Sequence, residues 1–143
     1  MLKIVHRSPF TSVCLVAMLC AFNLPVNAQN AVLDGKIFIA DAGEKGKPAD
    51  EKADVITFKD GKFHSSQCDQ YGYGKSDYKT STQGEVITFE AETNSDKDGR
   101  LVWRGNVRGN AIEGTFIHHR KGSFFNANPT PIEHWFKGKI KAD

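Results

Sequence analysis

The sequence RLVWRGNVRGNAIEGTFIHHR, from Arg100 to Arg120, carries the clearest structural signal in the chain. On each side of Gly109-Asn110, apolar residues alternate with polar ones, which is the pattern of half-buried β-strands. Glycine and asparagine suit a tight hairpin turn because they tolerate the positive φ that such turns need. The sequence therefore predicts a β-hairpin with strands over 100–108 and 111–120.

The same alternation continues along the rest of the chain. It predicts further strands over 32–40, 54–59, 62–68, 76–82, 85–93 and 132–141. Asp60-Gly61 and Gln83-Gly84 supply further tight turns, so consecutive strands are expected to pair antiparallel. Eight such strands predict an all-β fold, an antiparallel eight-stranded up-and-down barrel, with a two-sheet β-sandwich as the alternative. The connections over 41–52 and 121–131 are longer, and the first is polar and expected to be mobile.

One face of these strands is predicted to form the core. The side chains expected to point inward are Ile56, Phe58, Phe63, Ile87, Phe89, Leu101, Trp103, Val107, Ile112, Phe116, Phe136 and Ile140. Gly105, Gly114 and Gly138 fall on the same face. Small residues there indicate either strong strand curvature or space for a ligand.

The N-terminus indicates export. Lys3 and Arg7 precede a short apolar run that ends in small residues at Ala28, which predicts a cleaved signal peptide over 1–28 and a single β-barrel domain over 29–143. We therefore expect the periplasm or the exterior as the location, with no integral membrane segment after cleavage. Lys3 and Arg7 account for the formal net charge of +2, so the remaining chain is formally neutral, which argues against nucleic-acid binding.

Several motifs along the chain resemble one group of proteins. LDGK at 33–36, ITFKDGKFHSSQC at 56–68, YGYGKSDY at 71–78, ITFEAE at 87–92, WRGNVRGNAIEGT at 103–115 and HWFKG at 134–138 resemble small exported bacterial proteins of lipocalin-like (calycin-like) β-barrel architecture. The chain differs from true lipocalins in having Gly35-Lys36-Ile37 where a Gly-x-Trp motif is expected, and in being short. The resemblance suggests a ligand without identifying it.

Cys68 is the one cysteine left after the predicted cleavage, so no disulfide can form within the domain. A regular strand over 62–68 would turn Phe63 inward and both His64 and Cys68 outward, whereas a bulge near Ser65-Ser66 would turn Cys68 inward. An inert cysteine, a regulatory thiol and a catalytic nucleophile all stay open.

His118 and His134 are predicted to face the interior, either as hydrogen-bonded side chains or as ligands of a transition metal. Residues 94–99, NSDKDG, match the first half of a calcium loop, but the twelfth position is Gly105 where a glutamate is needed. We interpret them as a hairpin turn.

The predicted function is that of a non-enzymatic binding protein. A small apolar or amphipathic ligand is expected in the barrel, without a cofactor, a metal or catalytic residues. The candidate ligand-binding residues are Tyr71, Tyr73, Tyr78, Trp103, Phe116, His118 and His134. One alternative is a protein-interaction or inhibitor module that binds a protein partner through the 121–131 loop and its Phe124-Phe125 pair. The other is a metal- or thiol-dependent activity using His118, His134 and Cys68.

Overall fold

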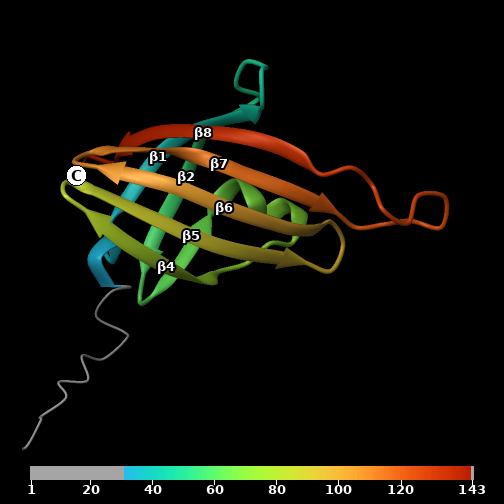
Figure 1. Cartoon of the computed structure of the whole chain (residues 1–143), viewed down its shortest axis with the longest axis horizontal. Helices are drawn as coiled ribbons and strands as arrows, with labels where there is room; N and C mark the ends of the chain where they lie inside the picture. Colours follow the sequence, from blue (N-terminus) through green and yellow to red (C-terminus); the bar gives the residue numbers. More distant parts are fainter. Residues whose placement is uncertain (1–30, 143) are drawn as a thin grey trace, which may run out of the picture.

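The computed structural model of the protein describes residues 31–142, so the predicted signal peptide lies outside the described residues. Eight strands form a closed barrel in which each strand pairs antiparallel with the next and the last returns to the first (Figure 1). They are β1 (Ile37–Glu44), β2 (Glu51–Lys59), β3 (Lys62–Ser65), β4 (Ser76–Gln83), β5 (Val86–Ser95), β6 (Gly99–Arg108), β7 (Ala111–Arg120) and β8 (Ile132–Ile140). The predicted eight-stranded up-and-down barrel is confirmed. The sandwich alternative is wrong because β1 and β8 pair along seven residues.

Strand ends match the expectation best where tight turns define them. β7 has the predicted bounds, and β6 begins one residue earlier than predicted. Asp60 and Gly61 both have positive φ, 53° and 71°, which confirms the expected hairpin turn between β2 and β3. The β5–β6 turn confirms that residues 94–99 form a hairpin connection: Ser95 Oγ accepts hydrogen bonds from the backbone N–H groups of Lys97 and Asp98.

The first predicted strand, 32–40, is wrong at its start. A short 3-10 helix, η2 (Ala31–Leu33), precedes β1, and Leu33 is fully buried. The Asp34 carboxylate then accepts hydrogen bonds from the Gly61 N–H at 3.0 Å and from the Tyr78 hydroxyl at 2.6 Å. Long-range contacts with two other segments therefore hold this part of the chain against the barrel instead of continuing β1.

Two further predictions need correction. The connection expected over 41–52 is shorter than predicted, because β1 extends to Glu44 and β2 begins at Glu51, which leaves residues 45–50 as the connection. Asp50 N–H donates to the Ala42 carbonyl at 3.0 Å. The strand expected over 62–68 stops at Ser65, and a second 3-10 helix, η3 (Ser66–Tyr71), follows. Strands β3 and β4 consequently share two register pairs, and the segment that contains η3 connects them.

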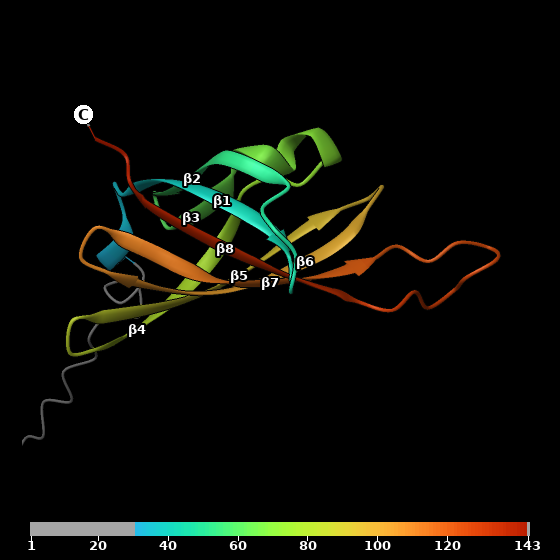
Figure 2. The same ribbon diagram turned by 90° about the horizontal axis from the view of Figure 1, so that it is seen from above.

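The two ends of the barrel differ in their connections (Figures 1 and 2). One end has the short β2–β3, β4–β5 and β6–β7 turns. The other end has the β5–β6 turn and the β7–β8 connection, residues 121–131, which extends well beyond the barrel and is called the arm from here on. Within residues 31–142, no helix has the length and apolar character needed to cross a membrane.

Candidate functional site

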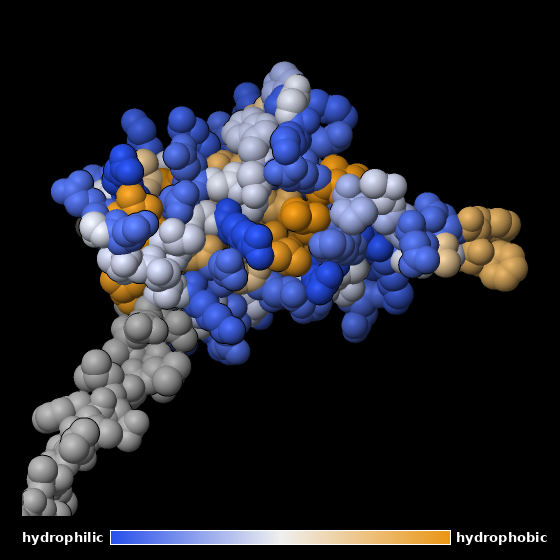
Figure 3. Space-filling view, in the orientation of Figure 1, coloured by the Kyte–Doolittle hydropathy of each residue, from blue (hydrophilic) through white to orange (hydrophobic). Residues whose placement is uncertain are grey.

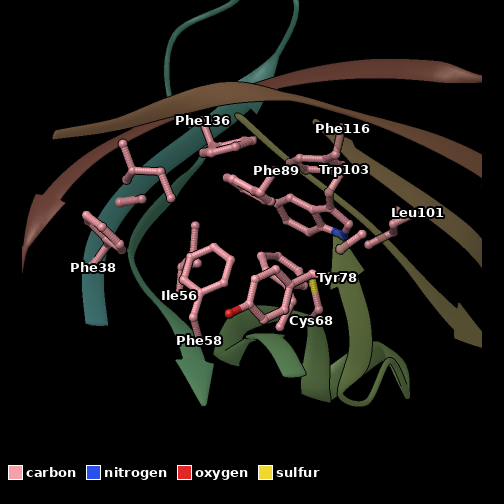
Figure 4. Packing of buried hydrophobic residues seen from close by; sticks show 14 of the residues in the cluster. Phe38, Ile56, Phe58, Cys68, Tyr78, Phe89, Leu101, Trp103, Phe116 and Phe136 are labelled. Carbon is pink, nitrogen blue, oxygen red and sulfur yellow. The ribbon is translucent and has the colours of Figure 1, made fainter. Parts of the chain in front are cut away.

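Aromatic rings fill the barrel interior (Figure 4). The Phe58 ring lies with its centroid 5.0 Å from those of Tyr78 and Phe89, and Trp103 lies 4.3 Å from Phe116. Every side chain predicted to point inward is buried or packs against the buried core, which confirms the predicted inward face. These rings make edge and tilted contacts of the kind found in close-packed cores.

The inward-facing glycines make room for this packing. A Cβ atom at Gly105 would lie 2.5 Å from Phe89 Cε1 and 2.7 Å from Phe136 Cζ. At Gly114, an added Cβ would meet the backbone of β6 as well as the Phe136 ring. The space that these glycines leave is thus occupied by the protein's own side chains.

The predicted ligand-binding residues fall into two groups. Tyr78, Trp103 and Phe116 belong to the core and are 1%, 2% and 7% exposed. Neighbouring rings cover their faces, and the Trp103 indole N–H donates to Thr93 Oγ1 at 3.3 Å. Ligand binding by these three side chains would require the core to open, and it stays a prediction.

The other four predicted residues lie toward the end of the barrel that carries the arm. Tyr71 is exposed, whereas Tyr73 is buried and its hydroxyl lies 3.2 Å from His118 Nε2. The His134 ring stacks on Phe116 with a centroid distance of 4.6 Å. Burial lowers the pKa of His134, so the imidazole is neutral at neutral pH.

Asp98 is a member of this cluster that the sequence interpretation did not connect with His118. Its carboxylate Oδ2 accepts a hydrogen bond from the Tyr73 hydroxyl at 3.2 Å and lies 3.3 Å from His118 Nε2. The sequence places Asp98 in the β5–β6 turn, but no local pattern shows which strand that turn approaches. We call Tyr73, Asp98 and His118 the end cluster.

Cys68 lies inside the protein, so its predicted outward orientation is wrong. The chain leaves the strand geometry at Ser66, and η3 turns the thiol inward, where the Ser65 hydroxyl lies 3.1 Å from Sγ. Burial raises the pKa of the Cys68 thiol to about 12, and the nearby Asp54 carboxylate adds to the increase. The thiol is therefore protonated at neutral pH and is a poor nucleophile.

Asp54 explains why η3 forms at this position. This buried carboxylate accepts hydrogen bonds from Ser65 Oγ at 2.6 Å, Ser66 Oγ at 3.0 Å and the Gln67 backbone N–H at 3.0 Å. Three donors at the start of η3 thus converge on one side chain of β2. The contacts of Cys68 and Asp54 favour a structural role for this region.

The arm is attached firmly at its base. The Lys121 backbone N–H donates to the Asp98 carbonyl at 3.1 Å, and Lys121 Nζ donates to the Asp96 carbonyl at 2.6 Å. At the tip, Ser123 and Asn126 exchange backbone hydrogen bonds of 2.8 and 3.2 Å. These reciprocal bonds form a tight turn with Phe124 and Phe125 as its two central residues.

Both central residues of this turn are almost completely exposed. The Phe124 and Phe125 side chains are 97% and 95% exposed, and their rings pack edge to face with a centroid distance of 5.3 Å. Figure 3 shows an apolar end of the arm beyond a hydrophilic stretch that separates it from the barrel, and Phe124 and Phe125 are the exposed large apolar residues of the arm. A groove of about 530 Å³ is lined by His119 and Arg120 at the end of β7 and by residues 127–131 of the arm.

Comparisons with protein-family models, with curated proteins and with solved structures found no match to this chain.

Proposed function

We propose that the protein is an exported, non-enzymatic interaction module that inserts Phe124 and Phe125 into an apolar pocket of a partner protein. The observation that carries this proposal is the nearly complete exposure of two adjacent phenylalanine rings at the tip of a hydrogen-bonded turn. Burying a phenylalanine side chain contributes about 1.5–3 kcal/mol. Two rings buried together therefore supply enough free energy to anchor a complex.

The shape of the arm supports a binding role. Because the Ser123–Asn126 hydrogen bonds already define the turn, little conformational entropy is lost when the tip enters a pocket. The anchoring of Lys121 to the β5–β6 turn has the same effect at the base. The filled barrel interior makes the arm a better candidate for binding than the cavity first expected from the sequence.

A protein partner fits the tip better than a lipid bilayer does. The two rings are flanked by the polar side chains of Ser123, Asn126 and Asn128. Hydroxyl and amide groups lose their hydrogen bonds to water on entering hydrocarbon, whereas a protein pocket can supply new partners. Arg120 and Lys121 lie at the arm's base, so an acidic rim around the pocket would complement them.

Site-specific photo-crosslinking tests the proposal. The full chain with a photoreactive phenylalanine at position 125 is produced in the organism that encodes it, and the crosslinked protein is identified and then purified separately. Its affinity is measured for the wild type, for F124S/F125S, and for the control V32S/I117S. The control removes two apolar side chains that are exposed elsewhere on the barrel.

We expect F124S/F125S to bind at least about 30-fold more weakly, which corresponds to the loss of one strong hot spot, while V32S/I117S binds like the wild type. F124S/F125S should keep the wild-type melting temperature, because the arm's rings bury nothing against the barrel. Equal affinity of F124S/F125S and wild type would overturn the proposal. So would flotation with lipid vesicles that depends on the two rings, which would identify a membrane as the partner.

A further inference from the structure

The end cluster brings together three side chains from separate parts of the chain. Tyr73 follows η3, Asp98 lies in the β5–β6 turn and His118 lies near the end of β7. The Tyr73 hydroxyl oxygen lies 3.2 Å from Asp98 Oδ2 and 3.2 Å from His118 Nε2, and these last two atoms are 3.3 Å apart. Two oxygens and one nitrogen thus form a nearly equilateral triangle.

The end cluster contains more close polar contacts than it has protons to share. His118 Nε2 also lies 3.1 Å from the Asp98 carbonyl oxygen, which makes four close polar contacts in the end cluster. The phenol has one proton, a neutral imidazole has at most one on Nε2, and the carboxylate has none. In the metal-free protein the two protons serve two of these contacts, from the Tyr73 hydroxyl to Asp98 Oδ2 and from His118 Nε2 to the Asp98 carbonyl. A cation in place of these protons would interact favourably with all four polar atoms.

The spacing of the three atoms fits a small metal ion. Zinc binds nitrogen and oxygen ligands at about 2.0–2.2 Å, and tetrahedral ligands at about 2.0 Å are separated by roughly 3.3 Å. The distances of 3.2, 3.2 and 3.3 Å in the end cluster match this separation. A metal could therefore bind with little rearrangement of the side chains.

We propose that Tyr73, Asp98 and His118 bind a divalent first-row transition ion such as Zn²⁺. Imidazole nitrogen with anionic oxygen is a donor set that such ions accept, and the carboxylate and phenolate together balance a charge of +2. The Asp98 side chain is 37% exposed, which gives the ion access from solvent. Within residues 31–142 no three His, Cys, Asp or Glu side chains are grouped to hold a metal, so this site depends on the Tyr73 phenol as its third ligand.

Metal binding at the end cluster requires the phenolate form of Tyr73, because the oxygen of a protonated phenol is a weak ligand. Binding therefore releases the phenol proton, and the affinity should increase with pH.

Metal titration of the purified protein tests this site. After expression of the full chain and removal of metals with a chelator, Zn²⁺ is titrated calorimetrically at several pH values, and Co²⁺ is followed by its visible absorption. The variants are Tyr73→Phe, His118→Gln and the control His64→Gln. His64 is a matched control because its Nε2 lies 2.8 Å from Asp69 Oδ1, an imidazole–carboxylate pair with no phenol beside it.

We expect one equivalent of Zn²⁺ to bind, with a higher melting temperature, an affinity that increases with pH and a Co²⁺ spectrum typical of tetrahedral coordination. Tyr73→Phe and His118→Gln should each weaken binding at least tenfold, while His64→Gln should have no effect. Tyr73→Phe keeps the ring that packs in the core, so it remains informative if His118→Gln does not fold. Absence of binding, or binding that Tyr73→Phe leaves unchanged, would overturn the proposal.

Discussion

Replacing Gly105 by alanine tests whether the barrel interior is packed. The added Cβ atom would lie 2.5 and 2.8 Å from two atoms of the Phe89 ring and 2.7 Å from Phe136 Cζ, so both rings must move away. Overpacking of this kind destabilises a core by about 1–3 kcal/mol. Gly105 does not have positive φ, so alanine causes no backbone strain at this position. Alanine also restricts the unfolded chain, which stabilises the protein by about 0.4–1 kcal/mol and offsets part of the overpacking cost.

The net expectation is that G105A unfolds with a free energy about 1–2 kcal/mol lower than the wild type. For a domain of this size that lowers the melting temperature by about 4–8 °C. Urea and thermal unfolding followed by circular dichroism measure both quantities. Gly74→Ala is the matched control, because Gly74 also lacks positive φ and an added Cβ would meet nothing within 4 Å. If G105A were as stable as the wild type or as G74A, the interior would have free space and the ligand-cavity interpretation would regain support.

Three further predictions concern buried polar groups. Because burial raises the pKa of Cys68 to about 12, the thiol should react slowly with iodoacetamide at pH 8 in the folded protein and rapidly in urea. For the same reason, the free energy of unfolding should decrease as the pH rises above 9.0, the ordinary pKa of a thiol. Burial lowers the pKa of His134 below 6.5, so the imidazole is protonated more readily in the unfolded state than in the folded state. The free energy of unfolding should therefore decrease as the pH falls through 6.5. His134→Phe should reduce this decrease, as measured by acid unfolding curves. Asp54→Ala removes the acceptor for three donors at the start of η3 and should lower the unfolding free energy by about 2–4 kcal/mol in urea titrations. The control Asp60→Gly changes a carboxylate at a positive-φ turn and should change the unfolding free energy by less than about 1 kcal/mol.

The predictions from sequence were accurate where the signal is local. Alternation of apolar and polar residues over 100–120 predicted the β6–β7 hairpin to within one residue of its bounds, because side chains on a strand alternate between faces whatever the strand pairs with. The inward position of Trp103 and Phe116 followed from the same rule. The Phe124-Phe125 pair was predicted to lie in the 121–131 loop, and both residues are exposed there.

The predictions failed where distant residues decide the local structure. The KFHSSQC segment has the alternation of a strand, yet hydrogen bonds to Asp54 on β2 end the strand at Ser65 and turn Cys68 inward. Leu33 likewise looks like part of the first strand until Asp34 is seen to accept hydrogen bonds from Gly61 and Tyr78. Such contacts join residues far apart in the chain, so no local pattern contains them.

The amino-acid order alone was enough for the all-β class, the number of strands, the turns between them and the faces of their side chains, because each depends on neighbouring residues. Closure of the barrel, the filling of its interior by aromatic rings and the meeting of Tyr73, Asp98 and His118 depend on how the strands pair and tilt. These features moved the candidate binding function from the barrel cavity to the arm, since only the folded chain shows which apolar side chains are covered and which stay exposed.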